Sequence, residues 1–139
     1  QAIAARGAEF GFVFNTTPES RIWNTFDAHR LLHWAGIEGR QLALKEALFK
    51  ANFTDGRATN DFDALVAAAA AAGLDGARAR QVLASAELAQ EVRAMQEAWR
   101  ARGAQAVPTI VFNQRWAIQG GQPPEVFERA IRDMLANPA

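Results

Sequence analysis

Apolar residues recur at three- and four-residue spacing over most of the first 103 positions, which predicts a series of amphipathic helices. The clearest run is Leu88, Val92, Met95 and Trp99, at steps of four, three and four. Ser85 precedes this run and is expected to cap its helix. The sequence predicts helices over residues 1–8, 26–36 after the caps Asn24 and Thr25, 38–52, 61–72 after Thr59 or Asn60, 75–83, and 85–102.

Two parts of the chain have the pattern of extended backbone instead. Phenylalanines 10, 12 and 14 alternate with Gly11 and Val13, which predicts a short extended segment. Residues 109–112 and 115–119 are rich in β-branched and aromatic residues and predict two strands joined by a turn at Asn113-Gln114. A last helix is expected to start at Pro123 or Pro124 and to bury Val126, Phe127, Ala130, Ile131, Met134 and Leu135.

The predicted hairpin needs more strands beside it. A two-stranded hairpin alone is marginal in water, and residues 109–112 are apolar on both faces, as in the interior of a covered sheet. We therefore expect partner strands encoded upstream of Gln1, with the last helix covering one face of the completed sheet. The predicted fold class is α+β and mostly helical.

Composition narrows the function classes. Lys plus Arg and Asp plus Glu both number 15, a balance that gives no sign of a nucleic-acid or acidic-membrane partner. No apolar run approaches the roughly 20 residues that span a bilayer. Cysteine is absent, so no thiol chemistry can come from these residues. The chain opens at Gln1 within a helical pattern, so we expect the true N-terminus to be missing; the compartment stays open, with the cytoplasm favoured.

Histidines and tryptophans are the other candidate site residues. His29 and His33 share a helix face at a spacing that can bind a metal, but no third ligand accompanies them, so we expect a packing role and no metal site. Trp34, Trp99 and Trp116 are expected in the core. Trp23 is expected to anchor the chain before a helix, with a place in a substrate cleft as the alternative.

Four stretches together carry a family resemblance. Residues 24–35 (NTFDAHRLLHWA) and 46–56 (EALFKANFTDG) resemble the insertion helices of FrnE-type DsbA-like proteins. Residues 106–112 (AVPTIVF) resemble the cis-proline strand of that family, and residues 119–127 (QGGQPPEVF) its closing loop and helix. Two positions depart from the pattern, since Asn52 and Gly121 stand where Tyr and Ala are expected.

The resemblance implies a thioredoxin fold with a helical insertion. Residues 1–104 would then be mostly the insertion, a cap over the active-site face, and residues 105–139 the C-terminal β-β-α part of the thioredoxin domain. The family's Cys-x-x-Cys would precede Gln1, so this chain would hold no catalytic residue and would be inactive alone. Val107, a cis Pro108 and Thr109 would bind the substrate, which is a protein or peptide thiol or disulfide, or glutathione as a co-substrate; no cofactor is implied.

Two other functions stay open. Glutathione-dependent hydroxychromene-carboxylate isomerases and kappa-class glutathione transferases share the inserted layout and usually carry serine in place of the first cysteine; residues 120–124 look more like the FrnE type. The second alternative is a non-catalytic helical binding module that is complete as given. A truncated chain, in contrast, should expose apolar strand surface at Ile110 and Phe112 or bury it by self-association.

Overall fold

The structure is a computed structural model, and it describes residues 2–17 and 20–137. The chain forms two compact units, Gln1–Arg93 and Ala94–Ala139, which we describe separately. The boundary falls inside one helix. The family resemblance predicts a different division, between a helical insertion up to residue 104 and part of the thioredoxin domain after it. That division stays a prediction, because the compact units reflect contacts within this chain and not the family's domain boundaries.

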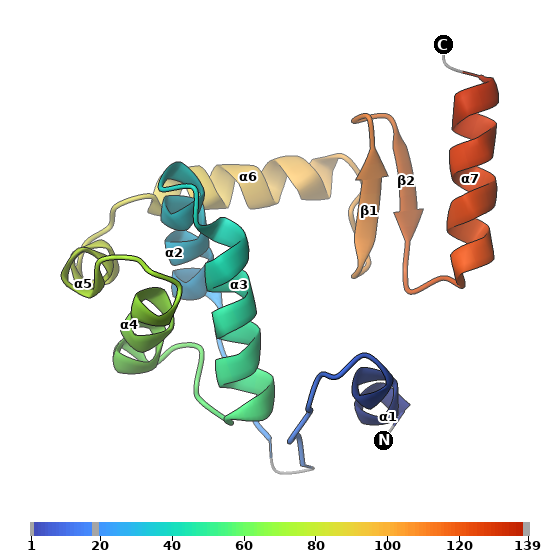
Figure 1. Cartoon of the computed structure of the whole chain (residues 1–139). Helices are drawn as coiled ribbons and strands as arrows, with labels where there is room; N and C mark the ends of the chain where they lie inside the picture. Colours follow the sequence, from blue (N-terminus) through green and yellow to red (C-terminus); the bar gives the residue numbers. More distant parts are fainter. Residues whose placement is uncertain (1, 18–19, 138–139) are drawn as a thin grey trace. The chain divides into compact units, whose positions relative to one another are not determined.

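Helices make up most of the described chain, with one small sheet, which confirms the predicted mostly helical α+β class (Figure 1). The helices are α1 (Ala2–Glu9), α2 (Phe26–Ile37), α3 (Gln41–Phe49), the π-helical turn η1 (Lys50–Thr54), α4 (Phe62–Ala71), α5 (Gly76–Ala84), α6 (Ala89–Ala101) and α7 (Pro124–Ala136). The strands are β1 (Thr109–Phe112) and β2 (Trp116–Gln119), paired antiparallel. Gln1 of the first predicted helix lies outside the described residues.

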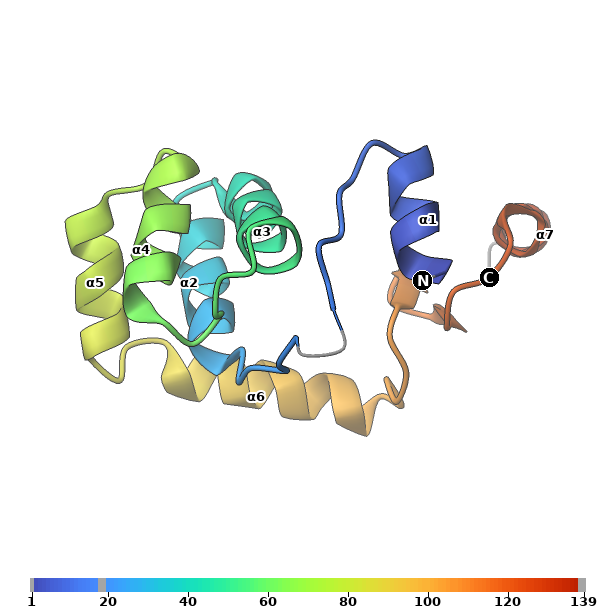
Figure 2. The ribbon, with the colours of Figure 1, turned by 90° about the horizontal axis from the view of Figure 1, so that it is seen from below.

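Helices α2 to α5 form the core of the first unit, and they lie side by side in both ribbon views (Figures 1 and 2). Each contributes a large side chain that is almost fully buried: Leu31, Leu44, Leu65 and Val82. Between these, small side chains such as Ala35, Ala69 and Ala79 are also inaccessible to solvent. Alanine at the contacts lets helix axes approach closely, so the alanine-rich sequence serves both helix propensity and packing.

One charged side chain is buried in this core. Arg30 of α2 is 4% exposed, and its guanidinium forms an ion pair with Asp27 at 2.8 Å. It also donates to the carbonyl of Val82, to that of Ser85 at 2.6 Å and to that of Glu87 at 3.0 Å. These carbonyls include the end of α5 and the turn after it, so Arg30 ties α2 to that turn.

A second arginine holds the same turn from outside. The guanidinium of Arg78 hydrogen-bonds both carboxylate oxygens of Glu87, one of them at 3.0 Å. This hydrogen bond lowers the pKa of the Glu87 carboxyl and raises that of Arg78, because each charge stabilises the other. Glu87 thus binds Arg78 through its side chain and Arg30 through its backbone.

The turn that these arginines hold replaces the predicted start of α6. The helix begins at Ala89, and Ser85 is the residue after α5 rather than the cap of α6, so the predicted cap is wrong. Ser85 Oγ accepts from the N–H of Glu87 at 3.2 Å, and Leu88 has a positive φ of 60°. Local hydrogen bonding by serine competes with helix formation, and here it ends one helix instead of starting the next.

Other boundaries also differ from the sequence prediction. Asp61, rather than Thr59 or Asn60, caps α4, since its carboxylate accepts from the N–H of Asp63 at 3.0 Å. The predicted helix 38–52 begins only at Gln41 and widens at its end into η1.

The segment with alternating phenylalanines pairs with no strand among the described residues. Instead, the N–H of Asn15 donates to the carbonyl of Phe53 at 2.8 Å, and Thr54 Oγ1 donates to that of Val13 at 2.6 Å. The Phe14 ring packs between Phe53 and α1, where a Cβ on Gly7 would lie 2.6 Å from that ring. Gly7 is therefore needed for this close approach, and α1 continues past it to Glu9.

The cap of α5 allows a direct stability test. The Asp75 carboxylate accepts from the N–H groups of Ala77 and Arg78 at 2.8 and 3.0 Å. Replacing Asp75 by alanine removes both acceptor bonds and should lower the free energy of unfolding by about 1 kcal/mol, measured by urea denaturation. Asp75→Asn keeps an acceptor at this position and should lose much less; equal losses in the two variants would contradict the capping role.

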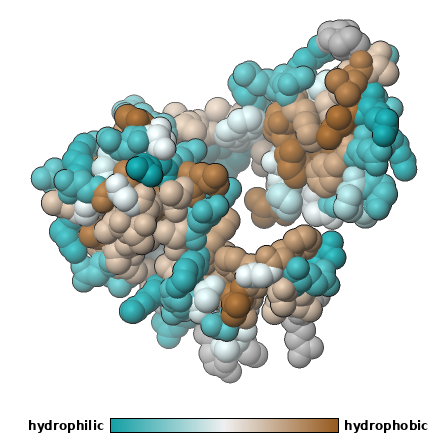
Figure 3. All heavy atoms as spheres, in the orientation of Figure 1, coloured by the Kyte–Doolittle hydropathy of each residue, from teal (hydrophilic) through white to brown (hydrophobic). Residues whose placement is uncertain are grey.

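The second unit contains the end of α6, the hairpin and α7. Its apolar side chains stay accessible to solvent, and Figure 3 shows them gathered over the hairpin and α7. The predicted buried face of the last helix is wrong for this chain: none of its described residues is buried, and Val126, Ile131 and Leu135 are 36%, 41% and 76% exposed. Two strands are too narrow to cover an amphipathic helix, so its apolar face finds no complete partner.

Candidate functional site

The segment that leads into β1 contains the predicted substrate-binding residues. The Val107–Pro108 peptide bond is cis, and the Val107 side chain is 94% exposed. The carbonyl of Pro108 accepts from the N–H of Gly120 at 2.8 Å, and Thr109 Oγ1 donates to the carbonyl of Ala106. These bonds fix the segment to both the loop before it and the end of β2.

The same bonds show which backbone groups of β1 are free. In an antiparallel pair, hydrogen-bonded and non-hydrogen-bonded residue pairs alternate. Pro108 and Gly120 form a bonded pair, so Ile110 and Ile118 form the next, and Thr109 and Val111 direct their N–H and carbonyl groups away from β2. Val107 has no backbone hydrogen bond within residues 2–17 and 20–137. The outer edge of β1 therefore offers alternate donors and acceptors from Val107 to Val111.

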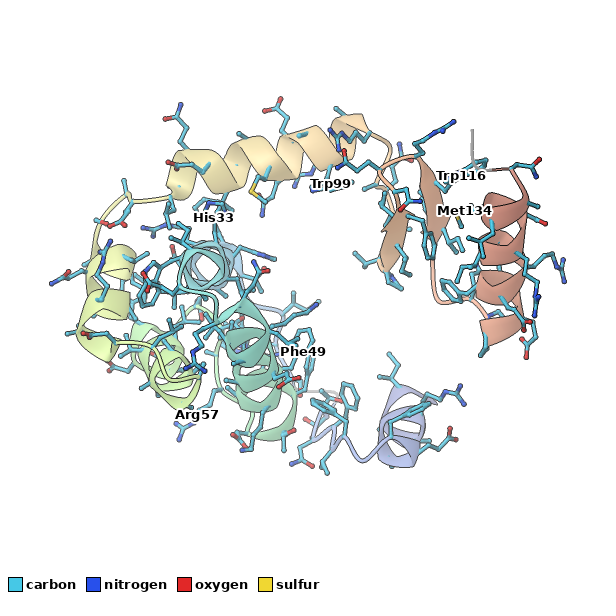
Figure 4. The ribbon with its side chains drawn as sticks, turned by 45° about the horizontal axis from the view of Figure 1, so that its top comes forward. His33, Phe49, Arg57, Trp99, Trp116 and Met134 are labelled. Atoms are coloured by element: carbon cyan, nitrogen blue, oxygen red, sulfur yellow. The ribbon has the colours of Figure 1, made fainter. Side chains whose placement is uncertain are left out.

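The two faces of the hairpin differ in what they meet. Thr109, Val111, Ala117 and Gln119 share one face and line a cleft of about 380 Å³ with the end of α6. Trp99 of α6 also borders this cleft (Figure 4). The opposite face carries Ile110, Phe112, Trp116 and Ile118, all accessible to solvent at least in part.

The other predicted site residues have mixed outcomes. Trp34 is buried as expected, but Trp99 and Trp116 are 40% and 44% exposed, so their predicted place in the core is wrong for this chain. The cause is the same lack of cover over the hairpin. Trp23 is partly buried and His29 exposed. In the part of the chain that the structure describes, no three side chains of His, Cys, Asp or Glu are grouped to hold a metal ion.

Sequence reasoning missed the buried Arg30. The sequence does contain a signal for this burial. Arg30 lies one turn before Trp34 on the apolar face of α2, and a buried charge without a partner there would destabilise the fold. Asp27, one turn earlier, is the matching partner at i−3.

Comparison with known proteins decides the family. The family model described as a DSBA-like thioredoxin domain matches residues 1–132. The chain belongs to the DsbA-like thioredoxin domain family. Among curated proteins, none matches it. Among solved structures, it is similar to a probable DsbA oxidoreductase from Streptomyces coelicolor, with 38% sequence identity and a TM-score of 0.90.

That alignment covers 98% of this chain and 58% of the Streptomyces protein, so this DsbA-like chain spans less than two thirds of its relative's length. The family is of thiol-disulfide oxidoreductase type, and the chain contains no cysteine. None of the described helices of this DsbA-like chain has the length and apolarity to cross a bilayer.

Proposed function

We propose that this chain is the substrate-guiding and cap portion of a FrnE-type thiol-disulfide oxidoreductase, whose dithiol lies outside these 139 residues. The observation that carries the proposal is that the backbone N–H and carbonyl of Val107, just before β1, are free within the described residues of a chain of the DsbA-like family. An extended peptide can pair with such free backbone groups through main-chain hydrogen bonds that do not depend on its sequence.

In the proposed reaction, the dithiol forms a mixed disulfide with a protein or peptide substrate. An attacking thiolate displaces one sulfur of a disulfide, and the leaving sulfur departs as a thiolate. Val107 would hold the substrate backbone beside the reacting sulfurs through its N–H and carbonyl, while the side chain of Val107 points to solvent. The helices of the first unit would limit which substrates can approach. We propose the cytoplasm as the compartment and no resident cofactor.

The first test is the encoded sequence upstream of Gln1. The proposal expects a strand followed by Cys-x-x-Cys, several tens of residues before Gln1. A serine without a dithiol would contradict it and support the glutathione-dependent isomerase or transferase. An initiator methionine with nothing else upstream would leave only the helical binding module.

The second test measures exchange in the protein expressed with that upstream segment. Val107→Pro removes the N–H donor and keeps an apolar side chain, and we expect disulfide exchange with a peptide substrate to slow about tenfold, the value of one lost hydrogen bond. Val107→Ala keeps the N–H and should stay within about threefold of the parent. Equal rates for the two variants, with unchanged melting temperatures, would show that the backbone of Val107 does not guide the substrate.

A further inference from the structure

The loop between α6 and β1, residues 103–108, has no regular secondary structure and contains Val107. Gly103 begins it with a positive φ of 87°. The N–H groups of Gly103 and Ala104 donate back to carbonyls of α6 at 2.9 and 3.1 Å, which ends the helix and turns the chain away from its axis. The rest of the loop has to be held by groups outside α6.

Two side chains of the hairpin hold this loop. Thr109 and Gln119 are partners in the strand register, in a pair without mutual backbone bonds, where opposite side chains lie closest together. Gln119 Nε2 donates to the carbonyl of Gly103 at 2.9 Å, and Thr109 Oγ1 donates to the carbonyl of Ala106. The pair therefore reaches from one face of the hairpin to two carbonyls of the loop, three residues apart.

A third bond holds the end of the loop. The N–H of Gly120 donates to the carbonyl of Pro108 at 2.8 Å. The carbonyls of residues 103, 106 and 108 are thus occupied, whereas the backbone of Val107 has no partner among residues 2–17 and 20–137. Residues 105–108 are exposed in this chain, so hydrogen bonds rather than apolar packing hold them. All three bonds join groups of this chain and do not require an open hairpin face.

We propose that Gln119 is a positioning residue for the substrate. Its amide fixes the start of the loop and, together with Thr109, keeps the free backbone groups of Val107 oriented toward a substrate strand. The identity of the substrate rests on the proposed function, and the attachment of the loop rests on the hydrogen bonds alone. Without the Gln119 bond, a substrate that pairs with Val107 must first order a mobile loop, which weakens binding and leaves the exchange chemistry unchanged.

The first measurement asks whether Gln119 holds the loop, and it requires no reaction. The protein is expressed with its upstream segment, and backbone order parameters of residues 104–107 are measured by nuclear magnetic resonance relaxation. Gln119→Met removes the donor at similar side-chain length, and we expect a fall from about 0.85, typical of a rigid backbone, to below about 0.6. Gln119→Lys keeps an N–H donor of similar reach and should keep the loop ordered. Equal order parameters in the parent and the Met variant would overturn the proposal.

The second measurement asks whether the ordered loop serves the substrate. For exchange with a peptide disulfide, Gln119→Met should raise KM about threefold and leave kcat unchanged, because the lost bond affects binding only. Exchange with dithiobis(nitrobenzoate), a disulfide without a peptide backbone, should not change. Gln41→Met is the matched control, because it removes an amide bond of the same kind, to the carbonyl of Leu32 at 3.1 Å, in the first unit. It should change neither KM nor kcat, and an equal rise in KM would contradict the assignment.

A double-mutant cycle tests whether Gln119 acts through Val107. In the Val107→Pro background the guided N–H is already absent, so Gln119→Met should raise KM by less than about 1.5-fold. A threefold rise in both backgrounds would show that Gln119 acts elsewhere and would overturn the proposal. Failure of the proposed function gives a different result, since neither disulfide would then be exchanged while the order parameters would still fall in the Met variant.

Discussion

Replacing Arg30 by methionine is expected to lower the free energy of unfolding of the chain by about 3–5 kcal/mol. The substitution keeps an apolar stem of similar length but removes every donor of a side chain that is 4% exposed. The Asp27 carboxylate loses its ion pair, and the carbonyls of Val82, Ser85 and Glu87 lose their charged donor. Urea denaturation followed by far-UV circular dichroism measures the loss.

Arg80→Met is the matched control for this prediction. Arg80 also forms an ion pair, with Asp63 at 2.6 Å, but its side chain is 53% exposed. A solvated pair of this kind contributes less than about 1 kcal/mol. Similar losses in the two variants would show that the burial of Arg30 does not determine its contribution. Arg30→Lys keeps the charge but cannot reach all four acceptors, so its loss should be intermediate.

Leu44→Ala in α3 is expected to destabilise the chain by about 3 kcal/mol or more. Leu44 is inaccessible to solvent in the contact of α3 with α2 and α4, and its removal leaves a cavity between helices that are held by their other contacts. Leu42 lies two residues away on the same helix and is 69% exposed. Leu42→Ala should therefore change stability by no more than about 0.5 kcal/mol. The same denaturation experiment compares the two, and equal losses would contradict the assigned core.

The sequence predicts most elements of this fold because their signals are local. The three- and four-residue spacing locates the helices, and a proline in the first turn marks α7. The turn at Asn113 and Gln114 is also found where predicted, and both residues have a positive φ. Because Phe112 pairs with Trp116, Arg115 also belongs to the turn and not to the second strand as predicted. Each of these features depends on neighbours within a few positions.

The predictions that fail depend on distant residues. Ser85 has the form of a helix cap, but Arg30, 55 positions earlier, binds its carbonyl. The apolar stripe of α7 and the indoles of Trp99 and Trp116 have the pattern of core residues, yet whether they are covered depends on what else the sheet contains. A periodic pattern shows which face would be buried and does not supply the surface that buries it.

The candidate site was predictable to a similar degree. The family resemblance indicated Val107, Pro108 and Thr109, and the structure adds which of their backbone groups are free. The cleft between one face of the hairpin and the end of α6 was not predicted, because it joins residues that are close only after the chain folds.

The alternation of bonded and free backbone groups along β1 also has a spectroscopic consequence. Amide protons of Thr109 and Val111 face away from β2 and should exchange with deuterium faster than that of Ile110, which lies in a bonded pair with Ile118. Any strand that docks on this edge would protect the two fast amides and leave Ile110 nearly unchanged. Hydrogen-exchange rates measured by nuclear magnetic resonance would then show at which residues of β1 a strand is bound. The measurement requires no thiol, no dye and no catalytic turnover.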